Sequence, residues 1–401
     1  MKKISLNGLI NFILFLYILS LYLLTYREGL NNIGNAVAFL LITIIWLNFL
    51  LTKKRLVFNK FLLIYLLFIA ICATSVFYAL DQGIVITKVK TLILIFLTML
   101  SLVNYINTFD KLRNVVIYFV YSGFIASIYI IINSDFYQIT RFGSELGNVN
   151  AMGMIIGISA VFCLYLILTE KKYLYLPFLL IMIPTILLTG SRKALLFICM
   201  SVIIILFLRN RNSIKNKIKF IFATIIIVMI SYFLVFNVPL FYEIIGARME
   251  NIVSFVSGEP VNERSLGTRF YMTKVGFEMF MDRPLTGYGI DNYRVLYGML
   301  PEGIETYAHN NYIELMVGTG IFGVLIYYLT HIIVLKDLFR ASKRNMYKTL
   351  CFTFIAIIVS YIILAPTLVY YYGKHFSFLL AIASVVGRVL GQADEKVKTN
   401  Q

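Results

Sequence analysis

Long runs of apolar residues recur along this chain, and they limit its fold more than any other feature. A helix rises 1.5 Å per residue, so about 20 apolar residues cross the hydrocarbon core of a bilayer. The composition agrees, because 60% of the residues are hydrophobic and only 14% are charged. In soluble proteins, about 45–50% of the residues are apolar and about 25% are charged. We therefore predict an all-α polytopic membrane protein and exclude the soluble globular class.

The apolar runs predict about twelve transmembrane helices. These cover residues 6–26, 34–52, 61–80, 88–106, 114–133, 149–169, 173–189, 194–208, 218–236, 311–334, 349–366 and 374–391. One connection is long and the others are short. The chain is thus expected to divide into residues 1–236 (spans one to nine), 237–309 (the long loop), 310–391 (spans ten to twelve) and 392–401 (a disordered tail).

The net charge of +17 comes mainly from lysine and arginine in alternate short loops. Such residues favour the cytoplasmic side of a membrane. This pattern predicts that both termini are cytoplasmic and that the long loop lies outside. The basic excess is therefore a sign of topology, and no nucleic-acid partner is expected.

The long outer loop has the composition of a folded segment, because Phe, Tyr, Met and Leu occur throughout it. Residues 243–256 and 267–281 are predicted to form short helices. Pro284 is expected to end the second one, since proline lacks an N–H and clashes with the preceding turn. A loop this long and apolar should fold back onto the membrane domain.

Three polar motifs fall on the predicted outer side. Residues 189–193 (Thr-Gly-Ser-Arg-Lys) interrupt an apolar stretch and place Arg192 near the lipid headgroups, either as part of a site or only as an anchor. Arg141, with Asn148 and Asn150, opens a span and can bind a phosphate or sugar hydroxyls. A helix cap beside an exposed arginine explains the second motif equally well.

The third motif begins at His309, where the long loop enters the helix predicted at residues 311–334. Histidine accepts protons near neutral pH, so His309 is a candidate general base. Gly320 and Gly323 fall on one face of that helix, which allows close packing. A lone histidine is usually structural, and we interpret His331 and His375 in that way.

The loop also carries several arginines whose guanidinium groups match phosphate oxygens. These are Arg248, Arg264, Arg269, Arg283 and Arg294. Acidic residues share the loop, so many of these charges can be ordinary surface. We find no P-loop, no His-Glu-x-x-His motif and no outer Asp-x-Asp pair, so neither a metal nor a cofactor is expected. An enzyme on the outer face of the membrane has no ATP or nucleotide sugar available. A lipid-linked phosphate ester is therefore the favoured substrate.

Together these motifs resemble the O-antigen ligases and the O-antigen or capsule polysaccharide polymerases of bacterial envelopes. His309-Asn310 with Gly320 and Gly323 follows the family pattern His-Asn-x9-Gly-x-x-Gly. Three further segments are similar to family motifs, namely Arg269 with residues 283–289, residues 189–192, and residues 141–143 with Asn148 and Asn150. The resemblance covers residues 140 to 325.

The resemblance implies metal-independent, inverting transfer of a glycan on the outer face of the bacterial inner membrane. The donor would be a glycan linked to undecaprenyl pyrophosphate. His309 would be the general base, and Arg192 and Arg269 would bind the pyrophosphate and stabilise the leaving group. Further substrate contacts would come from Arg141, Asn150, Ser191, Asn310, Arg248 and Arg264.

Polymerase and ligase share this site and differ in the acceptor, which is a lipid-linked repeat unit or lipid A-core; some relatives use protein. We favour the polymerase, because the Lys-, Ile- and Asn-rich composition suits either Gram class, whereas a lipid A-core ligase requires an outer membrane. A lipid-linked oligosaccharide flippase is the more distant alternative, but transporters usually show repeated halves and charged midplane helices. Membrane lipids, a flippase and a chain-length regulator are the expected partners.

Overall fold

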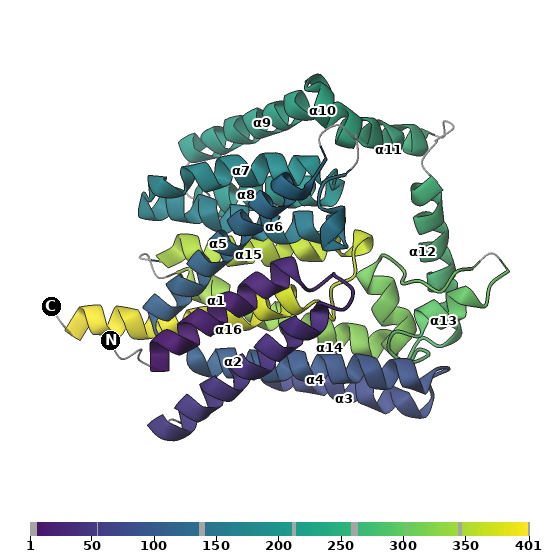
Figure 1. Ribbon diagram of the computed structural model, residues 1–401, viewed down its shortest axis with the longest axis horizontal. Helices are drawn as coiled ribbons and strands as arrows, with labels where there is room; N and C mark the ends of the chain where they lie inside the picture. The colour runs from purple at the N-terminus through teal and green to yellow at the C-terminus, as the bar shows by residue number, and fades with distance from the viewer. Residues whose placement is uncertain are drawn as a thin grey trace.

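The computed structural model describes residues 6–53, 55–135, 141–210, 214–257, 264–301, 303–343 and 347–399. Every regular element in these ranges is a helix, which confirms the all-α prediction. The long helices run side by side (Figure 1), with both chain ends at one end of the bundle and α12 (Arg264–Asp282) and α13 (Tyr293–Gly298) at the other. We call this second end the α12 end.

Twelve helices coincide with the predicted spans. They are α1 (Leu6–Leu23), α2 (Asn31–Thr52), α3 (Lys60–Thr74), α4 (Gln82–Tyr105), α5 (Phe109–Asn133), α6 (Val149–Glu170), α7 (Leu176–Leu188), α8 (Arg192–Asn210), α9 (Ile214–Asn237), α14 (Asn311–Ala341), α15 (Lys348–Leu364) and α16 (Lys374–Thr399). Because α16 continues to Thr399, the prediction of a disordered tail from residue 392 is wrong.

Nine helices in the described ranges are long and apolar enough to cross a membrane, or ten if the bent pair Thr224–Asn237 and Pro239–Asn251 forms one span. α7 is shorter than a full span, and α8 carries charged residues near both of its ends. The chain is therefore a multi-pass membrane protein, and the count of about twelve spans stays a prediction.

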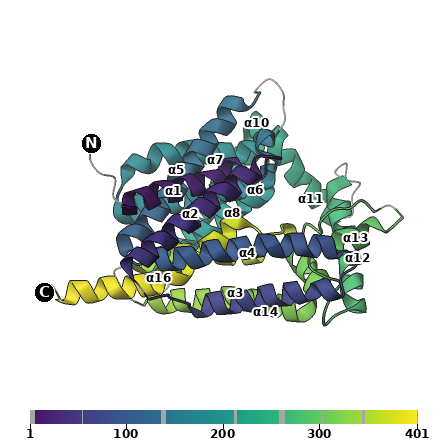
Figure 2. The same ribbon diagram turned by 60° about the horizontal axis from the view of Figure 1, so that its bottom comes forward.

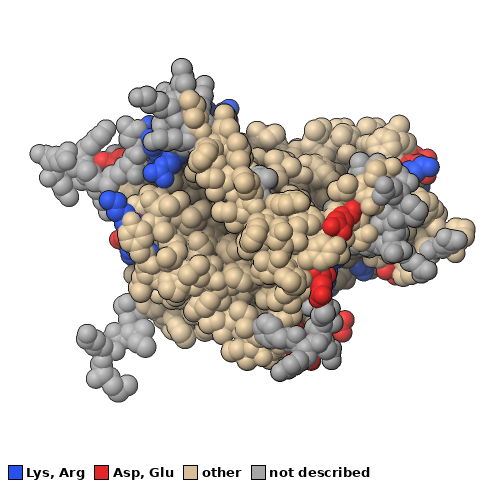
Figure 3. All heavy atoms as spheres, turned by 90° about the horizontal axis from the view of Figure 1, so that it is seen from above, with Lys and Arg blue, Asp and Glu red and all other residues tan. Residues whose placement is uncertain are grey.

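The surface of the bundle suits a lipid environment. Large apolar side chains such as Leu50, Phe77 and Ile132 are more than two-thirds exposed. On the face in Figure 3, charged side chains gather toward the two ends of the molecule and leave a broad belt between them without charge. Apolar surface on this scale is costly in water but is favourable against lipid chains.

The centre of the bundle is α6, which packs against α5, α7, α8 and α15. Small and hydroxyl-bearing residues bring these helices close together. The Ser159 hydroxyl on α6 donates to the Phe119 carbonyl of α5 at 2.6 Å and shares a second hydrogen bond with Tyr22 of α1, also at 2.6 Å. Such bonds between helices are typical of membrane bundles.

Short helices follow α9 in the region of the predicted loop. These are α10 (Pro239–Phe241), a π-helical turn (Tyr242–Gly246), α11 (Ala247–Ser257), α12 and α13. α12 ends at Asp282, beside Pro284. Met272 and Met279 of α12 pack in one buried cluster with Tyr293 of α13 and Val317 of α14. Figure 2 shows α12 and α13 gathered at the end of α3, α4 and α14.

The helix predicted at residues 311–334 is broken at Gly320, which has φ 62° and ψ −168°. This backbone region is essentially restricted to glycine. The interpretation of Gly320 as a packing position on a continuous helical face is therefore wrong. α14 consists of a short helix, residues 311–319, and a longer one, residues 321–341.

The loop at residues 284–289 fills the break through backbone hydrogen bonds. Tyr288 N donates to Val317 O at 2.7 Å, and Gly289 N donates to Gly318 O at 3.0 Å. Ile321 N donates to Pro284 O at 2.8 Å. These bonds satisfy groups that lose their helical partners at the break. Two motifs that are separate in the sequence therefore form one structural unit.

We predict that Gly320→Ala lowers the free energy of unfolding by about 2 kcal/mol or more. The new Cβ would lie 2.2 Å from Leu285 O, and φ would remain positive. Thermal unfolding of the purified protein in detergent measures the effect. Gly267→Ala in α12 is the matched control, because its Cβ would meet nothing within 4 Å. Equal melting temperatures for the two variants would show that the break does not need glycine.

Candidate active site

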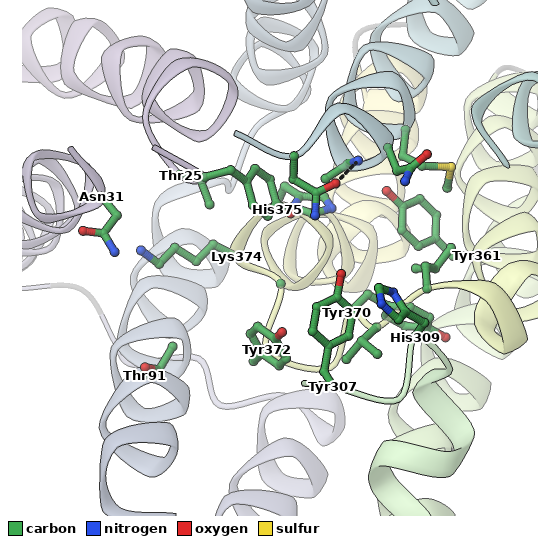
Figure 4. A pocket seen from close by; sticks show the side chains of 18 of the residues that line it. Thr25, Asn31, Thr91, Tyr307, His309, Tyr361, Tyr370, Tyr372, Lys374 and His375 are labelled. Carbon is green, nitrogen blue, oxygen red and sulfur yellow. Dashed lines mark hydrogen bonds between the residues drawn. The ribbon is translucent and has the colours of Figure 1, made fainter. Parts of the chain in front are cut away.

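A cavity of about 510 Å³ lies among the helix connections at the α12 end of the bundle. It is lined by segments that are far apart in the sequence. They are the α1–α2 connection (Thr25, Tyr26), the start of α2 (Asn31, Asn35), α4 (Lys88, Thr91), the start of α6 (Asn148, Asn150), the start of α8 (Lys193), Arg294 of α13, the segment before α14 (Tyr307, His309) and residues 368–375. Figure 4 shows His309 close to Tyr307 and Tyr370 in this cavity.

The candidate base His309 is partly buried in the cavity wall. Its imidazole ring lies 4.1 Å from the ring of Tyr307, measured between centroids. Its backbone has φ 55°, a left-handed conformation that is uncommon for residues other than glycine. Such a conformation persists only where the surrounding structure enforces it, and it is frequent at functional sites.

Hydrogen bonds on both sides of His309 hold this conformation. The Glu314 carboxylate accepts the backbone N–H of Ala308 at 2.6 Å, and Glu314 is only 1% exposed. The Asn310 side chain accepts the N–H groups of Tyr312 at 3.0 Å and Ile313 at 3.3 Å. Asn310, which we predicted to bind substrate, is therefore the N-cap of α14.

Asn311 joins the same helix start to the opposite wall of the cavity. Its side-chain oxygen accepts the backbone N–H groups of Tyr370 at 2.9 Å and Tyr371 at 3.0 Å. Its amide nitrogen donates to the Tyr328 hydroxyl at 3.0 Å. The side chain is fully buried. One amide thus fixes the distance between the His309 segment and residues 368–375.

The surroundings of His309 keep its imidazole neutral. Burial, followed by the positive charges of Arg269 and Lys193, lowers the pKa of His309 to about 4. Both causes disfavour the imidazolium form. Above that pH the ring is uncharged and can accept a proton, so His309 has the protonation state that a general base needs at neutral pH.

Arg141 and Asn150, which the sequence analysis places in one motif, contact each other directly. Arg141 donates from Nη2 to the Asn150 side-chain oxygen at 2.8 Å and from Nε to Thr189 O at 2.8 Å. Asn150 lines the cavity beside Lys193. Lys193 interacts electrostatically with Arg141 and with Arg269. The predicted motifs therefore converge on a single cationic region next to His309.

The turn at residues 189–192 is held against α11. Arg192 donates from Nη1 to Arg248 O, and Arg248 donates from Nη1 to Gly190 O at 3.2 Å. Ser191 accepts a backbone N–H of the first turn of α8 at 3.4 Å. Each of the three side chains supports the turn, while the next residue, Lys193, lines the cavity.

Sequence reasoning assigned no site role to four basic residues of the cavity, namely Lys193, Lys88, Lys374 and His375. Lys193 directly follows Arg192 in a motif that we had singled out. Lys88 and Lys374 are the first residues of two predicted spans (88–106 and 374–391). An ionisable residue at the end of a membrane span is itself a signal of function. His375 lines the cavity although we interpreted it as structural. Arg264 begins α12, and its side chain lies outside the described part of the structure.

Residues 177–328 match the family model described as O-Antigen ligase. This segment contains the turn at residues 189–193, Arg269, the loop at residues 284–289 and His309. The match confirms the resemblance to O-antigen ligases and polymerases that the motifs indicated. Members of this family are membrane glycosyltransferase-like enzymes that use lipid-linked glycans. The chain matches none of the curated proteins.

We predict that His309 titrates at about pH 4 in the free protein. NMR of protein labelled only at its three histidines follows the protonation of each ring. The His309 signal, assigned by its loss in His309→Gln, should stay that of a neutral ring as the pH falls through 6.5, the ordinary pKa. It should change only near pH 4. A midpoint near 6.5 would contradict the burial and the cationic surroundings described above.

We predict that Glu314 positions His309. Glu314→Ala removes the acceptor for the Ala308 N–H and should lower kcat for glycan transfer by about a hundredfold, because small displacements of a reacting group cost that much. KM for the donor should stay the same. Glu314→Gln keeps an oxygen acceptor and should retain most of the activity. Equal losses in both variants, or a rise in KM alone, would contradict a positioning role.

Proposed function

We propose that this protein is a polymerase of lipid-linked polysaccharide repeat units, such as those of O-antigen or capsule. It transfers a glycan from an undecaprenyl-pyrophosphate-linked donor to a hydroxyl group of an acceptor sugar. The observation that carries this proposal is the position of His309 in a cavity wall beside Arg269 and Lys193. A neutral base and several cations in one cavity are what such a displacement requires.

In the proposed reaction, His309 takes the proton of the acceptor hydroxyl. The hydroxyl oxygen then forms a bond to the anomeric carbon of the donor, while the bond from that carbon to the pyrophosphate oxygen breaks. The leaving polyprenyl pyrophosphate keeps the bonding electrons. Arg269, Lys193 and Arg141 stabilise its negative charge, with Arg192 behind them. His309 finally releases its proton to water, and neither a metal nor a cofactor takes part.

The same cations couple the two substrates. In the free protein, Arg269 and Lys193 lower the pKa of His309. A bound pyrophosphate neutralises these cations, so the pKa of His309 rises when the donor binds. His309 therefore becomes a stronger base only when a glycan is present to be transferred. This coupling favours binding of the donor before the proton leaves the acceptor.

We place the site on the outer face of the bacterial inner membrane, with both termini in the cytoplasm. The distribution of lysine and arginine over the loops supports this orientation. The segments that line the cavity around Asn31, Asn148, Lys193, His309 and Tyr370 are those that the charge distribution predicts outside. Both chain ends lie at the other end of the bundle (Figure 1).

A ligase is the second candidate, because the matched family model is described as O-Antigen ligase. A ligase would use the same base and the same cations. It would transfer finished polymer to lipid A-core, whereas a polymerase adds it to another lipid-linked repeat unit. The two functions differ only in the acceptor, so they differ in the intermediate that accumulates when the enzyme is lost.

A deletion strain complemented with variant genes tests the proposal. His309→Ala should lower transfer by about 10²- to 10⁴-fold, the usual effect of losing a general base. Arg269→Ala should also abolish long polymer. Arg283→Ala is the matched control, because Arg283 is an exposed arginine of the same region that stacks on Tyr288 and is not among the charges that lower the pKa of His309. It should restore normal glycan.

Gels and mass spectrometry of the surface glycans and the lipid-linked intermediates distinguish a polymerase from a ligase. Single repeat units without long polymer identify a polymerase. Long polymer that accumulates on undecaprenyl pyrophosphate but is missing from its final acceptor identifies a ligase. Normal glycan in both the His309→Ala and the Arg269→Ala strains would overturn the assignment of the site. It would favour the flippase function instead.

A further inference from the structure

The cavity has a second cationic end, formed by Lys88 of α4, Arg294 of α13 and Lys374 at the start of α16. We call it the Lys374 end. The charges that lower the pKa of His309 are those of Arg269 and Lys193, and Lys193 lines the same cavity. In Figure 4, Lys374 extends away from His309 and toward Asn31. The cavity therefore has further cations besides those that act on His309.

Positive charge at the Lys374 end exceeds the negative charge nearby. Lys88 Nζ lies 3.1 Å from the Asp291 carboxylate, and Arg294 Nε lies 3.9 Å from the same oxygen. The Asp291 carboxylate thus forms ion pairs with two cations. The buried Glu314 also interacts with both cations, but it does not line the cavity. Asp81 lines a neighbouring pocket with Lys88, Arg294 and Asp291, but no described residue that lines the cavity itself is acidic.

Lys374 has only a neutral partner within the described ranges of the chain. Its ammonium group donates to the Asn35 side-chain oxygen at 2.5 Å, and no described carboxylate pairs with it. Arg294 Nε is buried without a hydrogen-bond partner. An unmet buried donor is costly, and an anionic oxygen in the cavity would satisfy it. Both side chains therefore point to a negatively charged ligand.

The rest of this end suits a sugar. Asn31 and Thr91 supply an amide and a hydroxyl group to the cavity wall. Tyr372 supplies an aromatic ring, with Lys88 Nζ 3.6 Å from its centroid. A few polar groups set among aromatic side chains are typical of sites that orient a small polar ligand. The three cations, together with these neutral polar groups and the aromatic ring, suit an acidic carbohydrate.

We infer that the Lys374 end binds an anionic group of the acceptor glycan and thereby selects acidic acceptors. The anionic group is either a sugar carboxylate or a phosphate of the lipid that carries the acceptor. The inference rests on the proposed function, because that function brings an acceptor into the cavity. In this arrangement the donor pyrophosphate lies beside Arg269 and Lys193, and the acceptor lies in the cavity whose wall holds His309.

Equilibrium binding tests this inference without any need for transfer. The full-length protein in nanodiscs of neutral lipid is titrated calorimetrically with three probes. They are a trisaccharide ending in glucuronic acid, the same trisaccharide ending in glucose, and inorganic phosphate. We expect the charged probe to bind at least about tenfold more tightly than the neutral one, since hydrogen bonds to charged groups contribute that much.

Variants assign the charge preference to this end of the cavity. Lys374→Gln should remove it, whereas Lys374→Arg keeps the charge and should retain it. Lys343→Gln is the control, because Lys343 is exposed and does not line the cavity. Should Lys374→Gln fail to fold, Lys88→Met replaces it. Melting temperatures show which variants are folded.

The probes distinguish the two sources of the anion. Binding of the glucuronic acid probe that depends on Lys374 identifies a sugar carboxylate. Phosphate binding that depends on Lys374, without binding of the acidic sugar, identifies the phosphate of a lipid carrier. The inference is overturned if charged and neutral sugars bind equally and phosphate binding depends on Arg269 alone. Charge-selective binding in a protein that transfers no glycan would instead refute the proposed function and leave the site standing.

Discussion

The break in α14 at Gly320 is the constraint on which the site depends. Three backbone hydrogen bonds between residues 284–289 and 317–321 hold the short helix 311–319 at an angle to the long one. That helix carries His309 at its start, and Asn311 ties it to the backbone of Tyr370 and Tyr371. The break therefore sets the direction of the short helix whose preceding segment holds His309 in the cavity wall.

Several like charges lie close together beside the cavity. Lys193 interacts with Arg141 and Arg269, and like charges in a partly buried place repel each other. Under the proposed function, a bound pyrophosphate would reduce this repulsion, whereas a neutral lipid would not. Around Lys88 and Arg294 the repulsion is smaller, because Asp291 offsets part of the charge. We therefore expect the two groups of cations to differ in how strongly they favour an anion.

The sequence predicted the helices well, because lipid requires every backbone group to find a partner within a helix. It also predicted the end of α12 near Pro284. It did not predict the break, since a glycine in an apolar run is compatible with close packing or with a turn. The partner of Arg192 and the roles of Lys88 and Lys374 depend on contacts between distant segments, which no local pattern encodes.

One wall of the cavity comes from residues 368–375, close to the end of the chain. Membrane helices are inserted in order as the ribosome releases them, so this wall arrives after almost all the others. A nascent protein that already holds the cationic turn at residues 189–193 and even His309 still lacks a closed cavity. The cavity is therefore closed only when residues 368–375, which lead into α16, have folded against the earlier segments.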